Sequence, residues 1–301
     1  MITTFSRLLA ATAPPPASAN VTEYLAHVDA APRARTTVER AALAGSLADR
    51  LGFAFAGGYL AALERLLPGD GRACLLATET GGGHPRAIQT SLAPNGSGGF
   101  SLTGTKTFAT LARLADTFLV VASIGEKEGK NSLRVVRVPA TRAGVELTDL
   151  PPTPFAPELP HTTARFDDMA VEADEVLHGD GYDEYLKPFR TIEDVHVMAA
   201  VIGYVLRTGL AYGFGRATLE ELFGHLAALV ALGAAPPLER GVHVALAGVL
   251  AGLRATLGDA SAHWAAAPDE VQKRWLRDSP LLNVADRVRG ARTEAAWGRA
   301  R

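Results

Sequence analysis

The spacing of hydrophobic and polar positions changes twice along the chain and divides it into three parts. In the first part, Leu43, Leu47, Leu51 and Phe55 recur every four residues, which places them on one face of a helix. We therefore predict an N-terminal helical segment over residues 1–72.

The limits of this helix are suggested by capping and helix-breaking residues. Thr36 or Thr37 is placed to cap it, with Glu39 in its first turn. Gly57-Gly58 is expected to bend or break it, and Pro68-Gly69-Asp70-Gly71 marks a clear end.

In the second part, residues 73–183, the pattern indicates β-strands. Phe100 and Leu102 alternate with polar residues after the turn sequence Asn95–Gly99, which is typical of a hairpin. The apolar run Leu119–Ala122 reads as a buried strand. Short strands with turn signals at this spacing predict a β-sandwich or barrel.

In the third part, residues 184–301, the spacing becomes helical again. Long apolar-periodic stretches predict helices joined by short connections, with Pro280 dividing the last. The predicted ranges are Phe189–Phe214, Thr218–Leu232, Val242–Ala266 and 268–297. Helices with short connections form an antiparallel bundle, so the predicted fold class is α+β multidomain.

Composition narrows the function classes without choosing among them. The 301 residues are 48% apolar and 21% charged, with a net charge of −2, so neither nucleic acid nor a membrane surface is an expected partner. No apolar run reaches the length expected of a membrane span. The single cysteine, Cys74, excludes an intramolecular disulfide. No secretory signal pattern opens the chain, and we expect a cytoplasmic protein.

One glycine-rich turn stands out as a candidate binding element. Gly81, Gly82 and Gly83 follow Thr78 and Glu79. Glycine allows close backbone approach, and free N–H groups in such turns attract anions, phosphates above all. An ordinary turn between two strands remains equally open on this evidence. The eight histidines are scattered and form no metal-binding motif, so no metal is expected.

Several motifs in order resemble the middle domain of acyl-CoA dehydrogenases. They are T-E-x-G-x-G from Thr78, G-G-F-x-L-x-G-x-K-x-F-x-T ending at Thr110, and A-D-x-F-L-V-V-A ending at Ala122. A strand ending in V-P at Pro139 and the sequence F-D-D-M-A-V from Phe166 continue the match. The resemblance covers about residues 73–214 and implies FAD as cofactor and an acyl-CoA or acyl-thioester as substrate.

The resemblance also implies roles for particular residues on the flavin side. Thr110 corresponds to a threonine near the reactive edge of the flavin ring, and Phe108 to a tryptophan that packs on it. Gly83 corresponds to a glycine beside the flavin, and His84 stands where the family has a serine that contacts the pyrophosphate. Thr78 lies in the strand facing flavin and substrate. Without the resemblance, Phe108 would read as a core aromatic and Thr110 as a strand threonine.

The catalytic base is expected at one of two positions. In one branch of the family it precedes the glycine of an A-A-x-x-G segment by ten residues, which here gives Glu193. In the other it follows an R-D pair by eight residues, which here gives Asp286. The longer local match favours Glu193. A solvated residue in a first helical turn, for Glu193, and a surface pair with Arg289, for Asp286, are the alternatives.

Departures from the family concern the adenosine end of the cofactor. Glu220 stands where the family has an arginine that holds FAD across subunits, and the C-terminal G-G-x-G loop is missing. We therefore expect FAD binding to be weakened or lost.

Two functions stay open. One is a shortened flavoprotein that oxidises an acyl-CoA or acyl-thioester at Cα–Cβ, with an electron acceptor that the sequence does not indicate. The other is a degenerate, non-redox family member acting as a binding or partner subunit. The apolar predicted helix Val242–Ala266 favours a homo-oligomer in either case.

Overall fold

The computed structural model of the chain describes residues 3–69, 71–96 and 98–298, and these divide into two compact units. The helical unit comprises residues 1–65, 153–158 and 191–301, and the β unit comprises residues 66–152 and 159–190. The predicted ranges 1–72, 73–183 and 184–301 stay a prediction.

The N-terminal part of the helical unit contains four helices. They are α1 (Thr4–Ala10), α2 (Val21–Ala30), α3 (Thr37–Ser46) and α4 (Leu51–Leu66). Thr36 caps α3 in a capping box with Glu39, as the sequence predicted. Helix α2 was not expected; its cap, Asn20, accepts a hydrogen bond from the Glu23 N–H.

The break in this region lies at residues 47–50, and the expected break at Gly57-Gly58 is wrong. Both glycines are inside α4, where they allow close packing. A Cβ on Gly58 would lie 2.7 Å from the Val197 Cα atom, and one on Gly57 would lie 2.4 Å from the Tyr24 hydroxyl. Close helix contact, which a local pattern does not report, explains these glycines.

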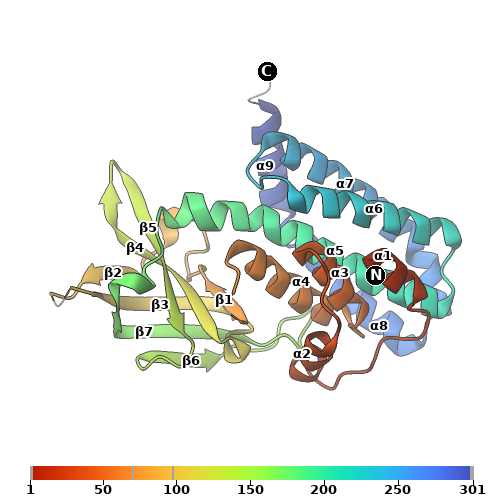
Figure 1. Cartoon of the computed structure of the whole chain (residues 1–301), viewed down its shortest axis with the longest axis horizontal. Helices are drawn as coiled ribbons and strands as arrows, with labels where there is room; N and C mark the ends of the chain where they lie inside the picture. The colour runs from red at the N-terminus through yellow and green to blue at the C-terminus, as the bar shows by residue number, and fades with distance from the viewer. Residues whose placement is uncertain (1–2, 70, 97, 299–301) are drawn as a thin grey trace. The chain divides into compact units, whose positions relative to one another are not determined.

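The rest of the helical unit is a bundle. Its longest helix begins in the β unit and continues into the helical unit. The helices are α5 (Lys187–Tyr212), α6 (Arg216–Ala234), α7 (Arg240–Asp259), α8 (Asp269–Asp278) and α9 (Asp286–Gly298). Figure 1 shows α6 and α7 side by side, with α9 against α7. Short 3₁₀ segments η5 (Ala260–Ala266) and η6 (Ser279–Asn283) complete it. As predicted, Pro280 lies where α8 and α9 are separated.

Among the residues that the structure describes, three helical stretches are long and apolar enough to cross a membrane, judged by length and composition alone: Gly181–Tyr212, Arg216–Ala234 and Arg240–Gly258. The expectation that no apolar stretch reaches this length was therefore too strict. Packing accounts for the first stretch, since 78% of its apolar window is buried. Only 17% and 22% of the windows in α6 and α7 are buried, so much of their apolar surface is only partly covered in the single chain.

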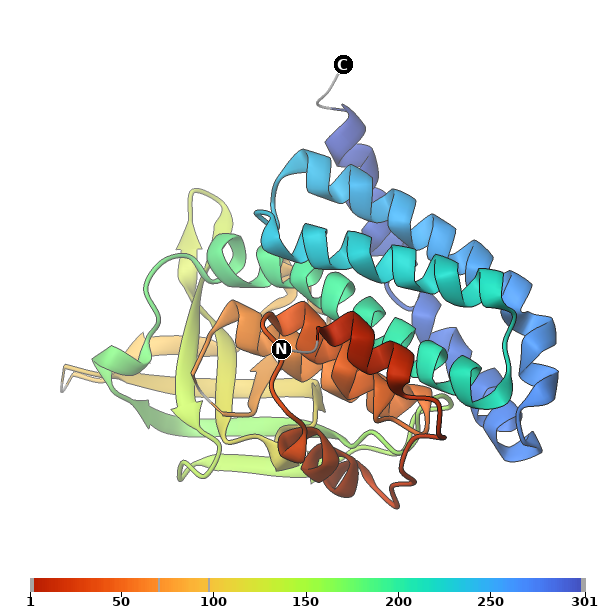
Figure 2. The ribbon, with the colours of Figure 1, turned by 45° about the vertical axis from the view of Figure 1, so that its right-hand side comes forward.

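The β unit is built on one seven-stranded sheet with the order β1-β4-β2-β3-β7-β6, in which β5 also pairs with β4. The strands are β1 (Ala73–Leu76), β2 (Ser91–Pro94), β3 (Phe100–Thr110), β4 (Thr117–Lys127), β5 (Lys130–Pro139), β6 (Val145–Asp149) and β7 (His161–Val171). In Figure 2 the β4–β5 pair crosses steeply over β3, β7 and β6, so the sheet curls around its core.

The core of the β unit lies along β4 and β5. Residues 118–122 of β4 are fully buried, which confirms the predicted buried strand, and Val135 and Val136 are buried on opposite faces of β5. Cys74 is also buried. The predicted fold class, with N-terminal helices, a β domain and a C-terminal bundle, is confirmed.

Candidate functional site

The glycine-rich loop, residues 78–84, is a closed turn attached to β3. The N–H of Gly82 donates to the Glu79 carbonyl (2.8 Å), and the N–H of Glu79 donates to the Gly82 carbonyl (3.3 Å). Gly82 has φ +99°, a conformation that favours glycine. The Thr107 N–H donates to the Thr78 carbonyl at 2.9 Å, which ties the loop to β3.

A buried ion pair holds the base of this loop. The fully buried Lys106 donates from Nζ to Glu79 Oε1 at 2.6 Å. The same carboxylate accepts from the N–H groups of Gln89 (2.8 Å) and Thr90 (3.0 Å). Burial opposes the charge on Glu79, but these hydrogen bonds outweigh it and lower its pKa. Glu79 is therefore satisfied internally and supports the loop.

Sequence analysis assigned no role to either partner of this pair. The available signal was the position of Lys106, four residues after the buried Leu102 on a strand whose faces alternate. A lysine at an inward position needs a buried partner, although the sequence does not say which carboxylate it meets.

Phe108 is held in an exposed and strained conformation on β3. Its side chain is 60% exposed, its φ is +51°, and it lies at an irregularity in the pairing between Lys106 and Ala109. A left-handed backbone conformation costs a non-glycine residue about 1–2 kcal/mol. Because Phe108 is exposed, burial of its ring does not compensate this cost. An aromatic ring is thus presented at the surface of the β unit, rather than in its core.

Thr110 and Phe108 meet at His161, a residue of β7 that the sequence analysis did not single out. The Thr110 hydroxyl lies 3.2 Å from His161 Nδ1. The rings of Phe108 and His161 meet edge to face, with centroids 6.3 Å apart. Burial lowers the pKa of His161, which favours a neutral ring. The pairing of Thr110 with His161 across β3 and β7 explains this contact.

The structure also brings Thr78 and Gly83 together. A Cβ on Gly83 would lie 3.4 Å from the Thr78 hydroxyl oxygen, which is ordinary contact distance. His84 is exposed, and its Nδ1 accepts a hydrogen bond from the Arg86 N–H at 3.2 Å. An accepting Nδ1 leaves Nε2 as the protonated nitrogen of the neutral ring, so His84 retains an outward donor.

The two candidate bases lie in the helical unit. Glu193 is half-buried near the start of α5. Asp286 opens α9 and lies between Arg254 (2.8 Å) and Arg289 (3.3 Å). The ion pair between Asp286 and Arg289 is the one that we predicted for the alternative in which Asp286 is not the catalytic base.

A neighbouring carboxylate fixes the turn of α5 that carries Glu193. Asp194 is 5% exposed and accepts a hydrogen bond from Arg289 Nε at 2.8 Å. Arg292 also donates to it. Two arginines from α9 thus anchor the residue next to Glu193, and neither was assigned this role from the sequence.

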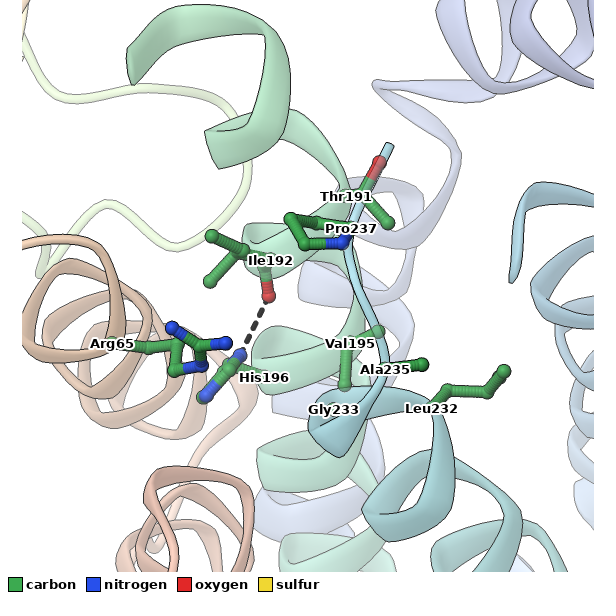
Figure 3. A pocket seen from close by; sticks show the side chains of 9 residues that line it. All are labelled: Arg65, Thr191, Ile192, Val195, His196, Leu232, Gly233, Ala235 and Pro237. Carbon is green, nitrogen blue, oxygen red and sulfur yellow. Dashed lines mark hydrogen bonds between the residues drawn. The ribbon is translucent and has the colours of Figure 1, made fainter. Parts of the chain in front are cut away.

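A small pocket beside α5 has room for about one water molecule. Figure 3 shows His196 and Arg65 on its wall, with the His196 ring bonded to the Ile192 carbonyl. His196 Nδ1 donates to that carbonyl at 2.7 Å, and Nε2 accepts from the Thr37 hydroxyl at 2.8 Å. Both ring nitrogens are used and the pocket is too small for an acyl chain, so we assign it a structural role.

Comparison with known proteins agrees with this geometry. Residues 74–169 match the family profile described as the acyl-CoA dehydrogenase middle domain. No curated protein matches the sequence.

Solved structures match most of the chain. Butyryl-CoA dehydrogenase from Megasphaera elsdenii has a TM-score of 0.66 at 16% identity, covering 86% of this chain and 82% of that one. The FAD complex of PigA has a TM-score of 0.66 at 14% identity, covering 99% and 90%. The prolyl acyl carrier protein oxidase AnaB has a TM-score of 0.65 at 15% identity, covering 99% and 91%.

The fold of the chain is therefore that of acyl-CoA dehydrogenase-like proteins. Within the β unit, residues 74–169 match the acyl-CoA dehydrogenase middle-domain profile, and the chain as a whole shares its fold with acyl-CoA dehydrogenases and related flavoproteins.

Proposed function

We propose that this protein is a flavin-binding oxidoreductase that oxidises an acyl-CoA or acyl-thioester between Cα and Cβ. The observation that carries the proposal is Phe108, an aromatic side chain kept 60% exposed in a strained backbone conformation. Strain of this kind clusters at ligand sites, and a flat aromatic ligand would cover the exposed ring. The match of residues 74–169 to the family's middle domain adds support.

The residues of the β unit fit the ring and phosphate portions of FAD. Phe108 would pack on the ring, with Thr110 and Thr78 as polar neighbours. Gly83 permits close approach of a ligand to the backbone, and His84 offers Nε2–H to a phosphate. When bound, the flavin supplies the hydride acceptor of the reaction.

For the proton, we assign Glu193 as the base that takes the α-hydrogen on its carboxylate. A base of this kind works best where water is partly excluded, and Glu193 is half-buried. The anchoring of Asp194 by α9 would keep the turn that bears Glu193 in place, which is a positioning role. Asp286, already between two arginines, is the weaker alternative.

An absorption spectrum tests the flavin part of the proposal. Purified protein would be measured before and after incubation with excess FAD and desalting. We expect flavin bands that survive desalting, followed by bleaching when a suitable acyl-CoA is added. Colourless protein in both samples would contradict the proposal.

Replacing Glu193 tests the assignment of the base. Glu193→Gln keeps the size of the side chain but removes its basicity, so acyl-CoA-dependent bleaching should fall by at least about a hundredfold, given the usual contribution of a general base. Bound flavin should stay unchanged, as read from its absorption. Asp286→Asn serves as the comparison variant and should keep most of the activity; the reverse result would move the base to Asp286.

A second candidate function, a non-redox binding or partner subunit, is favoured by one local observation. Glu220, at the position where the family carries an arginine for FAD, pairs with Arg216 at 2.7 Å on the exposed face of α6. That position therefore presents a carboxylate rather than a cation to any ligand. The cytoplasmic location stays a prediction.

A further inference from the structure

Arg190 is a cation held at the glycine-rich loop without a carboxylate partner. Its Nη2 donates to the Gly83 carbonyl at 3.3 Å, and its guanidinium lies 5.9 Å from the centre of the Tyr182 ring. The side chain is half-buried. Among the described residues no carboxylate forms an ion pair with it. A partly desolvated charge of this kind is favourably placed to bind an anion.

The carboxylates that precede Arg190 in its own segment are engaged elsewhere, and Asp194, four residues after it, pairs with Arg289 and Arg292. Asp180 Oδ1 accepts from the N–H groups of Tyr182 and Asp183, Asp183 pairs with Lys187 at 3.2 Å, and Glu184 accepts from the Asp180 N–H at 3.2 Å. None of these carboxylates pairs with Arg190.

The loop itself supplies further donors beside this cation. Gly82 and Glu79 use their N–H groups to close the turn, but no described residue accepts a hydrogen bond from the N–H of Thr80, Gly81 or Gly83. Backbone N–H groups with no internal acceptor, next to a guanidinium, form a concentration of donors that suits a phosphate group.

The segment that carries Arg190 is fixed to the same sheet as the loop. The Leu177 N–H donates to the Val135 carbonyl at 2.9 Å, and the π-helical turn η4 (Gly181–Leu186) packs on β5. A Cβ on Gly181 would lie 3.0 Å from backbone atoms of Arg134. Arg190 and the loop therefore belong to the same compact unit.

We propose that Arg190 and the 78–84 loop together form a diphosphate-binding site for a nucleotide ligand, with Arg190 as its principal cation. The inference rests on the proposed function only in taking the ligand to be FAD. The diphosphate of coenzyme A has the same chemistry, and the experiment separates the two. In either case Arg190 supplies a cation from this chain. It would replace the charge that is missing at position 220, where Glu220 stands in place of the family's arginine.

The test compares ligands with and without a diphosphate on one variant. Dissociation constants of FAD, ADP, coenzyme A and riboflavin would be measured by titration calorimetry for the wild type, Arg190→Gln and Arg190→Lys. Loss of a charged hydrogen bond should weaken FAD or coenzyme A about ten- to a hundredfold in Arg190→Gln. Riboflavin binding should not change, and Arg190→Lys should recover part of the loss because it restores the charge.

Arg165→Gln is the matched control, since Arg165 is an exposed arginine of the same unit that pairs with Asp167 at 3.2 Å. Equal losses in both variants, or equal losses of FAD and riboflavin, would overturn the proposal. If the protein binds no flavin and Arg190→Gln weakens the binding of coenzyme A, the result would support the Arg190 site and refute the proposed flavin function. Absence of binding by all diphosphate ligands to the wild type would overturn both.

Discussion

Near the candidate site, residues differ in whether their charge or ring is buried against a partner in the chain. Lys106 is fully buried against Glu79, and removing one partner of such a pair leaves the other uncompensated. The pair therefore keeps the loop in one arrangement. Phe108 and Arg190 differ from it, because the Phe108 side chain is 60% exposed and Arg190 donates to a neutral carbonyl oxygen, that of Gly83, instead of a carboxylate.

The same scale gives a prediction about acid. Burial is the main cause that lowers the pKa of His196 from 6.5 to about 4, so the folded ring stays neutral while an unfolded chain takes up a proton below pH 6.5. The free energy of unfolding should therefore be fully retained above pH 6.5 and fall by about 3 kcal/mol between pH 6.5 and 4. Urea denaturation at several pH values measures this.

His196→Gln provides the comparison for that experiment. The variant lacks the titrating ring, so its stability should depend less on pH over the same interval, even if it is less stable at pH 7. Parallel pH curves for the two proteins would show that another group causes the loss.

At the scale of elements, small residues rather than large ones determine how the central helices meet. A Cβ on Gly45 of α3 would lie 1.8 Å from the Ala200 carbonyl oxygen of α5, and one on Gly203 would lie 1.9 Å from the Ala42 carbonyl oxygen. The α3–α5 contact is therefore close enough that only glycine fits at either position.

Two alanine substitutions in helices test this packing. Gly45→Ala should lower the free energy of unfolding by about 2 kcal/mol or more, because backbone atoms must move to admit the methyl group. Gly248→Ala, in α7, meets nothing within 4 Å and should be neutral or raise stability by up to about 1 kcal/mol. Chemical denaturation of both variants measures the contrast, and equal effects would argue against close packing at Gly45.

Local sequence patterns predicted which helices and strands are present better than they predicted where these begin and end. The strand Leu119–Ala122, the cap at Thr36 and the division at Pro280 are confirmed, because each depends on nearby residues. The pattern missed α2 and placed the break of the first long helix at Gly57-Gly58. The glycines of α7 show how such contacts vary, since a Cβ on Gly252 would lie 2.8 Å from the His225 ring, whereas one on Gly248 would meet nothing within 4 Å. Whether a glycine marks a break or a contact depends on distant residues.

At the scale of the whole molecule, α6 and α7 carry apolar surface that the single chain does not cover. We propose that a second copy of the chain covers it, as the predicted homo-oligomer requires. Ala231→Arg, at an exposed position of α6, should therefore reduce the molar mass measured by light scattering without lowering the helix content.

Thr148→Arg, at an exposed position of β6, is the control and should leave the mass of the assembly unchanged. A wild-type protein that elutes with the mass of one chain would contradict the oligomer. Recovery of the wild type only in detergent would instead direct attention to a membrane.

The sequence by itself determined the three-part order of elements and the family resemblance of the β unit, and it predicted five residues for the flavin side, because all of these are carried by short motifs with fixed spacing. The tertiary structure decided which of them meet: Phe108 and Thr110 at His161, Thr78 with Gly83, and Glu79 with Lys106. It also brought Arg190 to a loop more than a hundred residues earlier in the chain. Such contacts depend on strand pairing and on burial, which act between segments far apart in sequence, so no local pattern contains them.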